Sequence, residues 1–350
     1  MLNARTLMVL GAGASYDFGM PLGEGLSKRI AEKVNIKFDF PNKLVSGNAD
    51  LMQALRIRAQ NEQCDVNLYR TAGCAIADGI SYSRSIDSYL SAHEDNPYVK
   101  ACGKLAIVQS ILEAERRSDL WVDPARANAK FHNQQKVMQS WLSDFMYLLT
   151  SGIARAKNLD RVFENLAIVN FNYDRCIEQF FWYALQDLYQ ISETDAAELV
   201  RSKLKMVRPY GKVGELPMGG RGVPFGATAG PAQLDVLAAD IRTFNEQVGD
   251  AELLTRVHTE IDACDRIIFL GFHFHKQNTD LLRPAKLSPA DDRTTPRVCF
   301  GTATGRSGPD VEVIQNRVRA IFHQRLPSSR IEAGLDCKGI FRTYVTAWGA

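Results

Sequence analysis

Short apolar runs alternate with longer stretches of helical periodicity along most of the chain. The first run covers residues 6–10 and stops at a glycine-rich turn, after which Pro21 opens a helical pattern that extends to Val34. Such alternation predicts an α/β fold with a doubly wound, mostly parallel, Rossmann-like sheet whose two faces are covered by helices. Later strands are predicted at residues 166–171, 205–207, 266–272 and 297–301, and later helices at 176–188, 234–248, 253–264 and 311–321.

Residues 41–159 have a different character. Runs of β-branched residues disappear there and helical periodicity dominates, with Trp141, Phe145 and Leu148 on one face. We predict a helical insertion subdomain at 41–159, within a sheet domain formed by 1–40 and 160–350. Its apolar faces fit either a contact surface for another subunit or burial within one chain. A glycine- and proline-rich stretch, 214–231, predicts a long surface loop, with a lid over a site as one interpretation.

Composition and charge narrow the class of protein. The 350 residues are 45% apolar and 23% charged, the balance of a soluble globular protein, and a net charge of +2 gives no overall electrostatic case for nucleic-acid binding. The seven cysteines never show C-x-x-C spacing, so we expect reduced thiols in a cytoplasmic protein. No stretch approaches the roughly 18 apolar residues of a membrane span, and the apolar run before Gly11 is shorter than a secretory signal core.

The strongest chemical signal is the loop that follows the first predicted strand, Gly11-Ala12-Gly13-Ala14-Ser15. Glycines there let backbone amides approach a diphosphate, which the positive end of the following helix also favours. The dinucleotide fingerprint G-x-G-x-x-G is not met because Tyr16 replaces the third glycine, and no Walker A lysine follows. Two glycines after a strand are also compatible with a simple tight turn.

The full spacing G-A-G-x-S-x-x-x-G-x-P, which ends at Pro21, resembles the nucleotide-binding signature of the sirtuin superfamily. Asn172 and Asp174 end a strand in a segment similar to that family's Q-N-x-D element, and the resemblance implies that they lie against the nicotinamide ribose. The segment 85–90, S-I-D-S-Y-L, is similar to a stretch found in many bacterial sirtuin-like defence proteins, in which Asp87 either orients a ribose or caps a helix. The resemblance implies NAD contacts at Gly11, Ala12, Gly13, Ala14, Ser15, Pro21, Asp87 and Gly271.

The chain also departs from sirtuin deacylases. Their L-H-G triplet, whose histidine acts as a base, corresponds here to Pro209-Tyr210-Gly211, and a tyrosine with an ordinary pKa of about 10 is a poor base near neutral pH. The scattered cysteines do not form the four-cysteine zinc module, and Leu22-Gly23-Glu24 replaces the deacylase triplet D-F-R. Deacylation of acyl-lysine is therefore the least favoured activity, and we expect no metal.

Several other polar residues have more than one interpretation. His273-Phe274-His275 follows a strand, and either one imidazole replaces the missing base or both are structural, since the remaining histidines are too few for a metal site. Glu113, Glu115, Arg116 and Arg117 resemble a solvated helix face, and Cys176 fits a buried thiol better than a nucleophile.

The resemblance implies an NAD⁺ hydrolase that releases nicotinamide and ADP-ribose. The leaving group departs neutral from a cationic ring, so the site must hold an oxocarbenium-like sugar and direct a water at it, a task that suits Asn172 and Asp174. Tyr210 and His275 are the predicted groups for proton handling. Related bacterial proteins deplete NAD to abort phage infection, often beside a HerA-type ring ATPase or an Argonaute-like subunit, so a homo-oligomer or such a partner is expected to gate the activity. The alternative is that the protein is not an enzyme but a regulatory module that binds NAD or an ADP-ribose-like signal.

Overall fold

A six-stranded parallel sheet forms the centre of the protein, in a computed structural model that describes residues 1–41, 43–126, 129–287, 297–326 and 328–349. Every residue of its three central strands is buried, which explains why these segments read as continuous apolar runs. Leu10 pairs with both Asn170 and Leu270, so the three central strands end at the same level. The strands are β1 (Thr6–Leu10), β4 (Leu166–Asn170), β5 (Lys205–Val207), β6 (Arg266–Leu270), β7 (Val298–Thr302) and β8 (Ser328–Glu332).

The strand order is β5-β4-β1-β6-β7-β8. The chain therefore moves outward from β1 through β4 to β5, returns to the other side of β1 at β6, and moves outward again to β8. This is the Rossmann order, in which ligands bind at the carboxyl ends of the strands where the direction reverses. The predicted fold class, a doubly wound parallel sheet, is confirmed, and the reversal point lies between β1 and β6.

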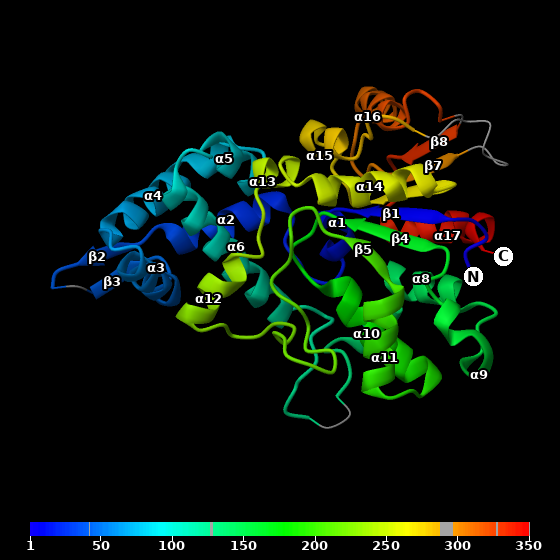
Figure 1. The fold of residues 1–350 in the computed structure, drawn as a ribbon, viewed down its shortest axis with the longest axis horizontal. Coiled ribbons are helices and arrows are strands. Elements are labelled where there is room, and N and C mark those ends of the chain that lie inside the picture. The colour runs from blue at the N-terminus through cyan, green and yellow to red at the C-terminus, as the bar shows by residue number, and fades with distance from the viewer. Residues whose placement is uncertain (42, 127–128, 288–296, 327, 350) are drawn as a thin grey trace.

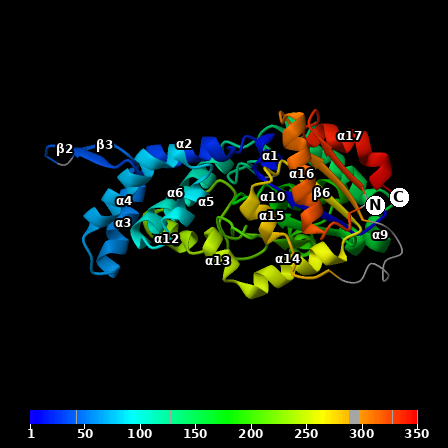
Figure 2. The same cartoon turned by 90° about the horizontal axis from the view of Figure 1, so that it is seen from above.

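Helices cover both faces of this sheet, with α14 on one face and α17 together with α8 on the other (Figures 1 and 2). On the first face α14 packs against β5, and α16 packs against α15 and β8. On the second face α17 contacts α8 and β7. These helices are α8 (Trp141–Thr150), α10 (Cys176–Tyr189), α11 (Glu193–Lys203), α14 (Ala251–Ala263), α15 (Lys276–Leu281), α16 (Gly308–Ile321) and α17 (Cys337–Trp348).

A second group of helices projects beyond one end of the sheet (Figure 1). The helix α6 is buried along most of its length because α2, α4 and α12 all pack against it. Two of these, α2 and α12, lie outside residues 41–159, whereas α8 lies inside that range and packs on the sheet helix α17; the division at 41–159 stays a prediction. The group contains α2 (Gly23–Val34), α3 (Ala49–Asn61), α4 (Val66–Gly79), α5 (Ile86–Ala92), α6 (Pro97–Arg116), α12 (Pro231–Ala238) and the hairpin of β2 (Lys37–Asp39) and β3 (Lys43–Ser46).

Short elements complete the chain: α1 (Ala12–Tyr16), α7 (Gln134–Met138), α9 (Arg155–Asn158) and α13 (Phe244–Val248), with 3-10 turns η1 (Ile80–Tyr82) and η2 (Leu159–Arg161). The predicted loop at 214–231 is indeed free of helix and strand as far as Gly230. It is not a purely surface loop, however. Val223 and Phe225 are buried, and a Cβ on Gly226 would come within 2.6 Å of the Arg116 backbone, so the loop packs tightly on the end of α6.

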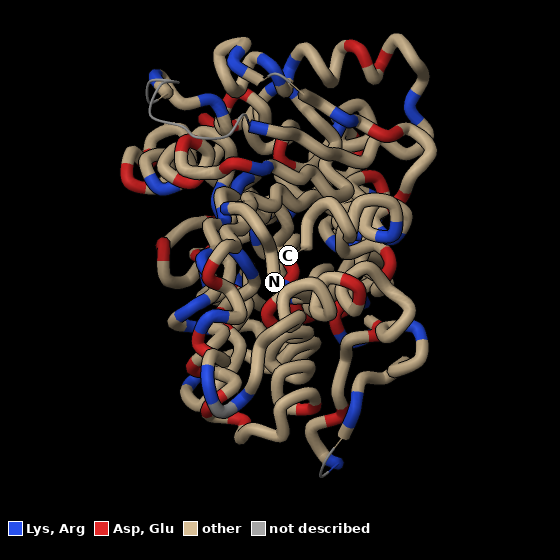
Figure 3. The backbone as a smooth tube through the Cα atoms, turned by 90° about the vertical axis from the view of Figure 1, so that its right-hand side faces the viewer, with Lys and Arg blue, Asp and Glu red and all other residues tan. Residues whose placement is uncertain are grey.

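The distribution of charged residues agrees with the small net charge of the chain. Basic and acidic positions are interspersed on the face shown in Figure 3. Among the described helices, none combines the length and apolar character that crossing a bilayer requires. All seven cysteines carry free thiols, and five of them are buried.

Candidate functional site

Two glycine loops meet where the strand order reverses. The loop after β1 and the loop after β6 are joined by backbone hydrogen bonds, from the Gly11 amide to the Leu270 carbonyl and from the Gly13 amide to the Gly271 carbonyl, each at 3.0 Å. A Cβ added to Gly11 or Gly13 would come within 2.6 Å of Gly271. The glycines are thus required by the close approach of the two loops, and two of the amides that we expected to face a diphosphate are already used inside the protein.

Gly271 is the most constrained of these residues. Its φ of +56° lies in the left-handed region, and a Cβ there would come within 2.1 Å of the Ala14 nitrogen. Its own amide donates to the hydroxyl of Thr302 at the end of β7, at 2.9 Å. On the other side, the indole of Trp141 in α8 donates to the Ala14 carbonyl at 2.8 Å. The loop pair is therefore held both by the end of the neighbouring strand β7 and by the covering helix α8.

Ser15, Asn172 and Asp174 form one buried hydrogen-bonded network beside these loops. The Asn172 amide donates to the Gly11 carbonyl at 3.0 Å and to the Ser15 hydroxyl at 3.1 Å. The Ser15 hydroxyl in turn donates to Asp174 Oδ1 at 3.1 Å, which also accepts the Cys176 amide. Within the described part of the chain, Asn172 Oδ1 accepts no hydrogen bond. It is therefore an atom of this network that is left for a water or a sugar hydroxyl.

Arg208, which the sequence analysis did not single out, supports the segment that carries this network. Its guanidinium donates to the carbonyls of Asn172 and Asp174 at 2.8 and 2.9 Å. The same group forms an ion pair with Glu178 at 2.6 Å, and both side chains are largely buried. Burial alone would raise the pKa of Glu178, but the neighbouring Arg208 and Lys212 cations lower it below its ordinary value. A charged Glu178 therefore fixes Arg208, and Arg208 fixes the turn after β4.

Asp87 and Tyr210 lie together through Tyr173. The Tyr173 phenol donates a hydrogen bond to the Asp87 carboxylate, and its ring meets that of Tyr210 with centroids 6.1 Å apart. Burial raises the pKa of Asp87 to about 6, even though the Tyr173 hydrogen bond opposes the shift. Burial and the nearby Asp87 also raise the pKa of Tyr210, whose hydroxyl donates to Asn278 at 2.8 Å. Asp87 is thus a base matched to neutral pH, while Tyr210 keeps its proton.

A buried amide without partners lies against the same cluster. Gln247 of α13 is fully buried, and neither atom of its amide group makes a hydrogen bond with the described residues. The group lies near the Tyr210 hydroxyl. Unsatisfied buried amides are costly and mark places where a water or ligand group fits. No sequence motif indicated this residue.

His275 lies apart from the network. It precedes α15, its ring lies 4.5 Å from that of His273, and Arg306 lies against His273. Burial, followed by the neighbouring His273 and arginine charges, lowers the pKa of His275 to about 4. Its imidazole is neutral at pH 7 and a weak base. Among the described residues, no cluster of three or more histidine, cysteine or acidic side chains could hold a metal ion.

Glu115 corrects the expectation of a solvated face at residues 113–117. Its side chain is completely buried in an ion pair with the equally buried Arg175, at 2.5 Å. Glu115 Oε1 also accepts the Arg175 amide, and Oε2 accepts the Gly226 amide. The pair therefore joins α6, the start of α10 and the long loop directly behind Asp174. Cys176, the next residue after Arg175, is a fully buried thiol, as expected.

The predicted site residues thus divide into groups. Gly11, Gly13, Ser15, Asn172, Asp174 and Gly271 are joined in one network, with Ala12 and Ala14 on the same loop. Asp87 and Tyr210 form the second group, and His275 and Pro21 make no hydrogen bond to either group among the described residues.

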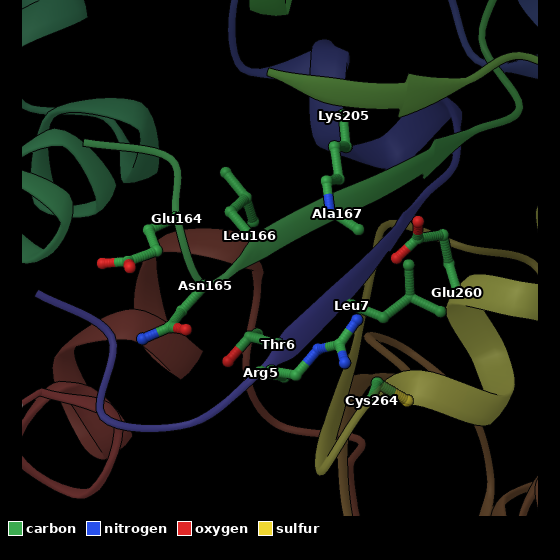
Figure 4. Close-up of a pocket in the computed structure, with 10 residues that line it drawn as sticks. All are labelled: Arg5, Thr6, Leu7, Glu164, Asn165, Leu166, Ala167, Lys205, Glu260 and Cys264. Carbon is green, nitrogen blue, oxygen red and sulfur yellow. The ribbon is translucent and has the colours of Figure 1, made fainter. Parts of the chain in front are cut away.

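The two cavities described in this structure lie away from that network. The first, of about 20 Å³, is lined by Arg5, Leu7 and Ala167 among others, at the amino ends of β1 and β4, and holds roughly one water (Figure 4). The second lies at the β5 edge of the sheet. No protein-family model matches this chain, and no curated protein matches it in sequence. The likeness to sirtuins is therefore a resemblance in sequence motifs.

Proposed function

We propose that the protein is a sirtuin-like NAD⁺ hydrolase that produces nicotinamide and ADP-ribose. One observation carries the proposal: at the reversal point of a Rossmann-ordered sheet, the G-A-G-x-S loop meets Asn172 and Asp174, and no described residue donates a hydrogen bond to Asn172 Oδ1. In this type of sheet the crevice at the reversal point is the place where dinucleotides bind.

The reaction breaks the bond between the ribose C1′ and the nicotinamide nitrogen, adds water to C1′ and releases one proton. The electron pair of the broken bond stays on nicotinamide, which leaves as a neutral ring, so an oxocarbenium-like sugar develops at C1′. Asn172 Oδ1 accepts a hydrogen bond from the attacking water or from a ribose hydroxyl, and Ser15 and Asp174 hold the Asn172 amide in that orientation. The reaction therefore needs accurate positioning more than a strong base.

The proton of the attacking water requires an acceptor. Among the predicted groups, Tyr210 is protonated because its pKa is raised, and His275 is a weak base because its pKa is lowered to about 4. Asp87, with a pKa of about 6, is largely charged at pH 7. Of the three groups, it is the strongest base that is deprotonated at this pH. We assign the proton acceptor to Asp87 and a hydrogen-bonding role to Tyr210.

The test is chromatography of NAD⁺ incubated with the purified chain and two asparagine variants. Asn172→Ala removes the proposed positioning group. Asn165→Ala is the matched control, because Asn165 precedes the opposite end of β4 and, among the described residues, its side chain donates only to the Leu2 carbonyl, at 2.9 Å. We expect wild type and Asn165→Ala to release nicotinamide and ADP-ribose, and a folded Asn172→Ala to lose about 100-fold or more in rate. Full activity of Asn172→Ala would show that the role of Asn172 is misassigned.

A binding module for NAD or ADP-ribose is the second candidate, and the burial of the network favours it. Asn172 and Asp174 are 7% and 3% exposed, so in this conformation they act chiefly as supports of the glycine loop. Calorimetry separates the two functions: a module would bind NAD⁺ at one site per chain and return it unchanged.

The resemblance also suggests a biological setting for the activity. We propose that the protein acts in anti-phage defence and that assembly or a partner subunit gates it, because unrestrained NAD⁺ loss is toxic. Expression in bacteria should then lower cellular NAD⁺ only after phage infection, and the Asn172→Ala variant should leave it unchanged.

A further inference from the structure

A cavity of about 390 Å³ lies at the β5 edge of the sheet, between α10, α11 and the loop that follows β5. Small-molecule sites in proteins usually have volumes of about 300–1,000 Å³. This cavity is therefore large enough for a compact organic ligand. It is separate from the glycine loops, because none of its lining residues belongs to the loops after β1 or β6.

Its lining combines an apolar wall with basic groups. Leu204, Met206 and Met218 supply part of the wall, and Lys212 and Arg221 add positive charge. Two carboxylates also line the cavity: Glu178 pairs with Arg208, and Glu215 pairs with Lys212, so these four charges offset one another. Arg221 has no acidic partner in the part of the chain that the structure describes. The site thus offers apolar contact on one side and an unpaired cation on the other.

We propose that this cavity binds a small organic anion, with the apolar body of the ligand against Met206 and its acidic group beside Arg221. Apolar lining with a few placed polar groups is the usual composition of small-molecule sites, and the cations select the charge of the ligand. The proposal does not depend on NAD⁺ hydrolysis.

The cavity is connected to the Asn172–Asp174 segment by a short chain of contacts. Lys212 lies 3.6 Å from Glu178, which holds Arg208 at 2.6 Å. Arg208 donates to the carbonyls of Asn172 and Asp174. The next residue in the loop, Val213, donates its amide to the Tyr173 carbonyl at 3.2 Å. A ligand that fills the cavity contacts Lys212 and Glu178 and therefore also stabilises the turn that carries the candidate site.

The test uses 8-anilinonaphthalene-1-sulfonate, an aromatic anion whose fluorescence rises in an apolar site. We expect saturable binding at one site per chain. Arg221→Glu replaces attraction by repulsion, and Met206→Glu places a charge in the apolar wall, so each is expected to weaken binding by about tenfold or more. Two matched controls keep wild-type affinity: Arg319→Glu, on α16 near the opposite edge of the sheet, and Met206→Leu, which preserves volume.

A second measurement follows hydrogen exchange at the Val213 amide. Bound dye should slow this exchange, whereas inorganic sulfate at the same concentration, which lacks an apolar body, should leave it unchanged. Binding that does not saturate, or wild-type affinity in either Arg221→Glu or Met206→Glu, would overturn the site. Unchanged exchange at Val213 with dye bound would overturn its connection to the Asn172–Asp174 segment.

Discussion

The phenol of Tyr173 donates a hydrogen bond to the carboxylate of Asp87, 86 residues earlier in the chain. This contact joins α5, in the projecting group of helices, to the segment after β4 that carries Asn172 and Asp174. It places a buried acid with a pKa of about 6 at the carboxyl edge of the sheet.

Asp87 makes stability depend on pH. Its pKa is raised from 3.8 to about 6 by burial, so between these values the folded chain binds more protons than the unfolded chain. The free energy of unfolding therefore falls as the pH rises from about 4 to about 6. We expect Asp87→Asn to be more stable than wild type at pH 7 and equally stable near pH 4, as measured by urea unfolding across this range. Tyr173→Phe removes the hydrogen bond that favours the charged carboxylate, so it should move the window to higher pH; an unmoved window would contradict the assignment.

The rate of the proposed NAD⁺ hydrolysis should depend on the ionisation of Asp87. A proton acceptor must be ionised, so nicotinamide release should rise as the pH increases through about 6 and then level off. Asp87→Asn should lose this dependence together with about 100-fold or more of the rate. The measurement is nicotinamide release from pH 5 to 8 in both proteins. An Asp87→Asn variant with the wild-type pH profile would exclude Asp87 as the acceptor.

Gly271→Ala should disrupt the contact between the two glycine loops. The new Cβ would have to occupy space 2.1 Å from the Ala14 nitrogen, at a φ of +56°. We expect a loss of about 3 kcal/mol or more in the free energy of unfolding. Gly305→Ala is the matched control, because Gly305 also has a positive φ, +73°, but its Cβ would meet open space. That variant should lose only about 1 kcal/mol, and equal losses in the two variants would contradict the role of close approach.

Glu115→Gln should be far more destabilising than Glu113→Gln, two residues earlier on the same helix. The first change leaves the buried Arg175 guanidinium without a counter-charge, and breaking such a pair costs about 3–5 kcal/mol. The second breaks the pair of Glu113 with Lys33, which is partly exposed and stabilises the fold by about 1 kcal/mol at most. Urea unfolding of both variants measures the difference. Similar midpoints would show that the Arg175 charge is compensated elsewhere.

The sequence predicted the elements of the candidate site that directly follow strands. In a parallel sheet the loops after adjacent strands meet at one edge, so the order of β1, β4 and β6 was enough to bring Gly13, Asn172 and Gly271 together. Residues that reach this edge from elsewhere had no such signal. Arg208 and Gln247 are single polar residues in irregular or short segments, and only the three-dimensional packing shows that they lie here.

Burial of charged residues was the other limit of the sequence analysis. Glu115 lies among Glu113, Arg116 and Arg117, and this local composition is typical of a solvated face. Glu115 is buried by residues 60 and 111 positions further along the chain, Arg175 at the start of α10 and Gly226 in the long loop. Trp141 had a second role that the sequence did not indicate. Its helical spacing indicated a core position, and its indole also donates a hydrogen bond to the Ala14 carbonyl.

The contact between Gly11, Gly13 and Gly271 means that selection for the fold and selection for activity act on different residues. Since backbone atoms alone exclude any side chain at these positions, the fold itself keeps the three glycines whether or not a nucleotide ever binds. A descendant without the proposed activity would retain them, whereas replacement of Asn172, whose Oδ1 no described residue uses, would cost the fold only the two hydrogen bonds that its amide donates to Gly11 and Ser15. Among distant homologues, variation at position 172 on a constant glycine background would therefore mark the lineages that lack the proposed hydrolysis.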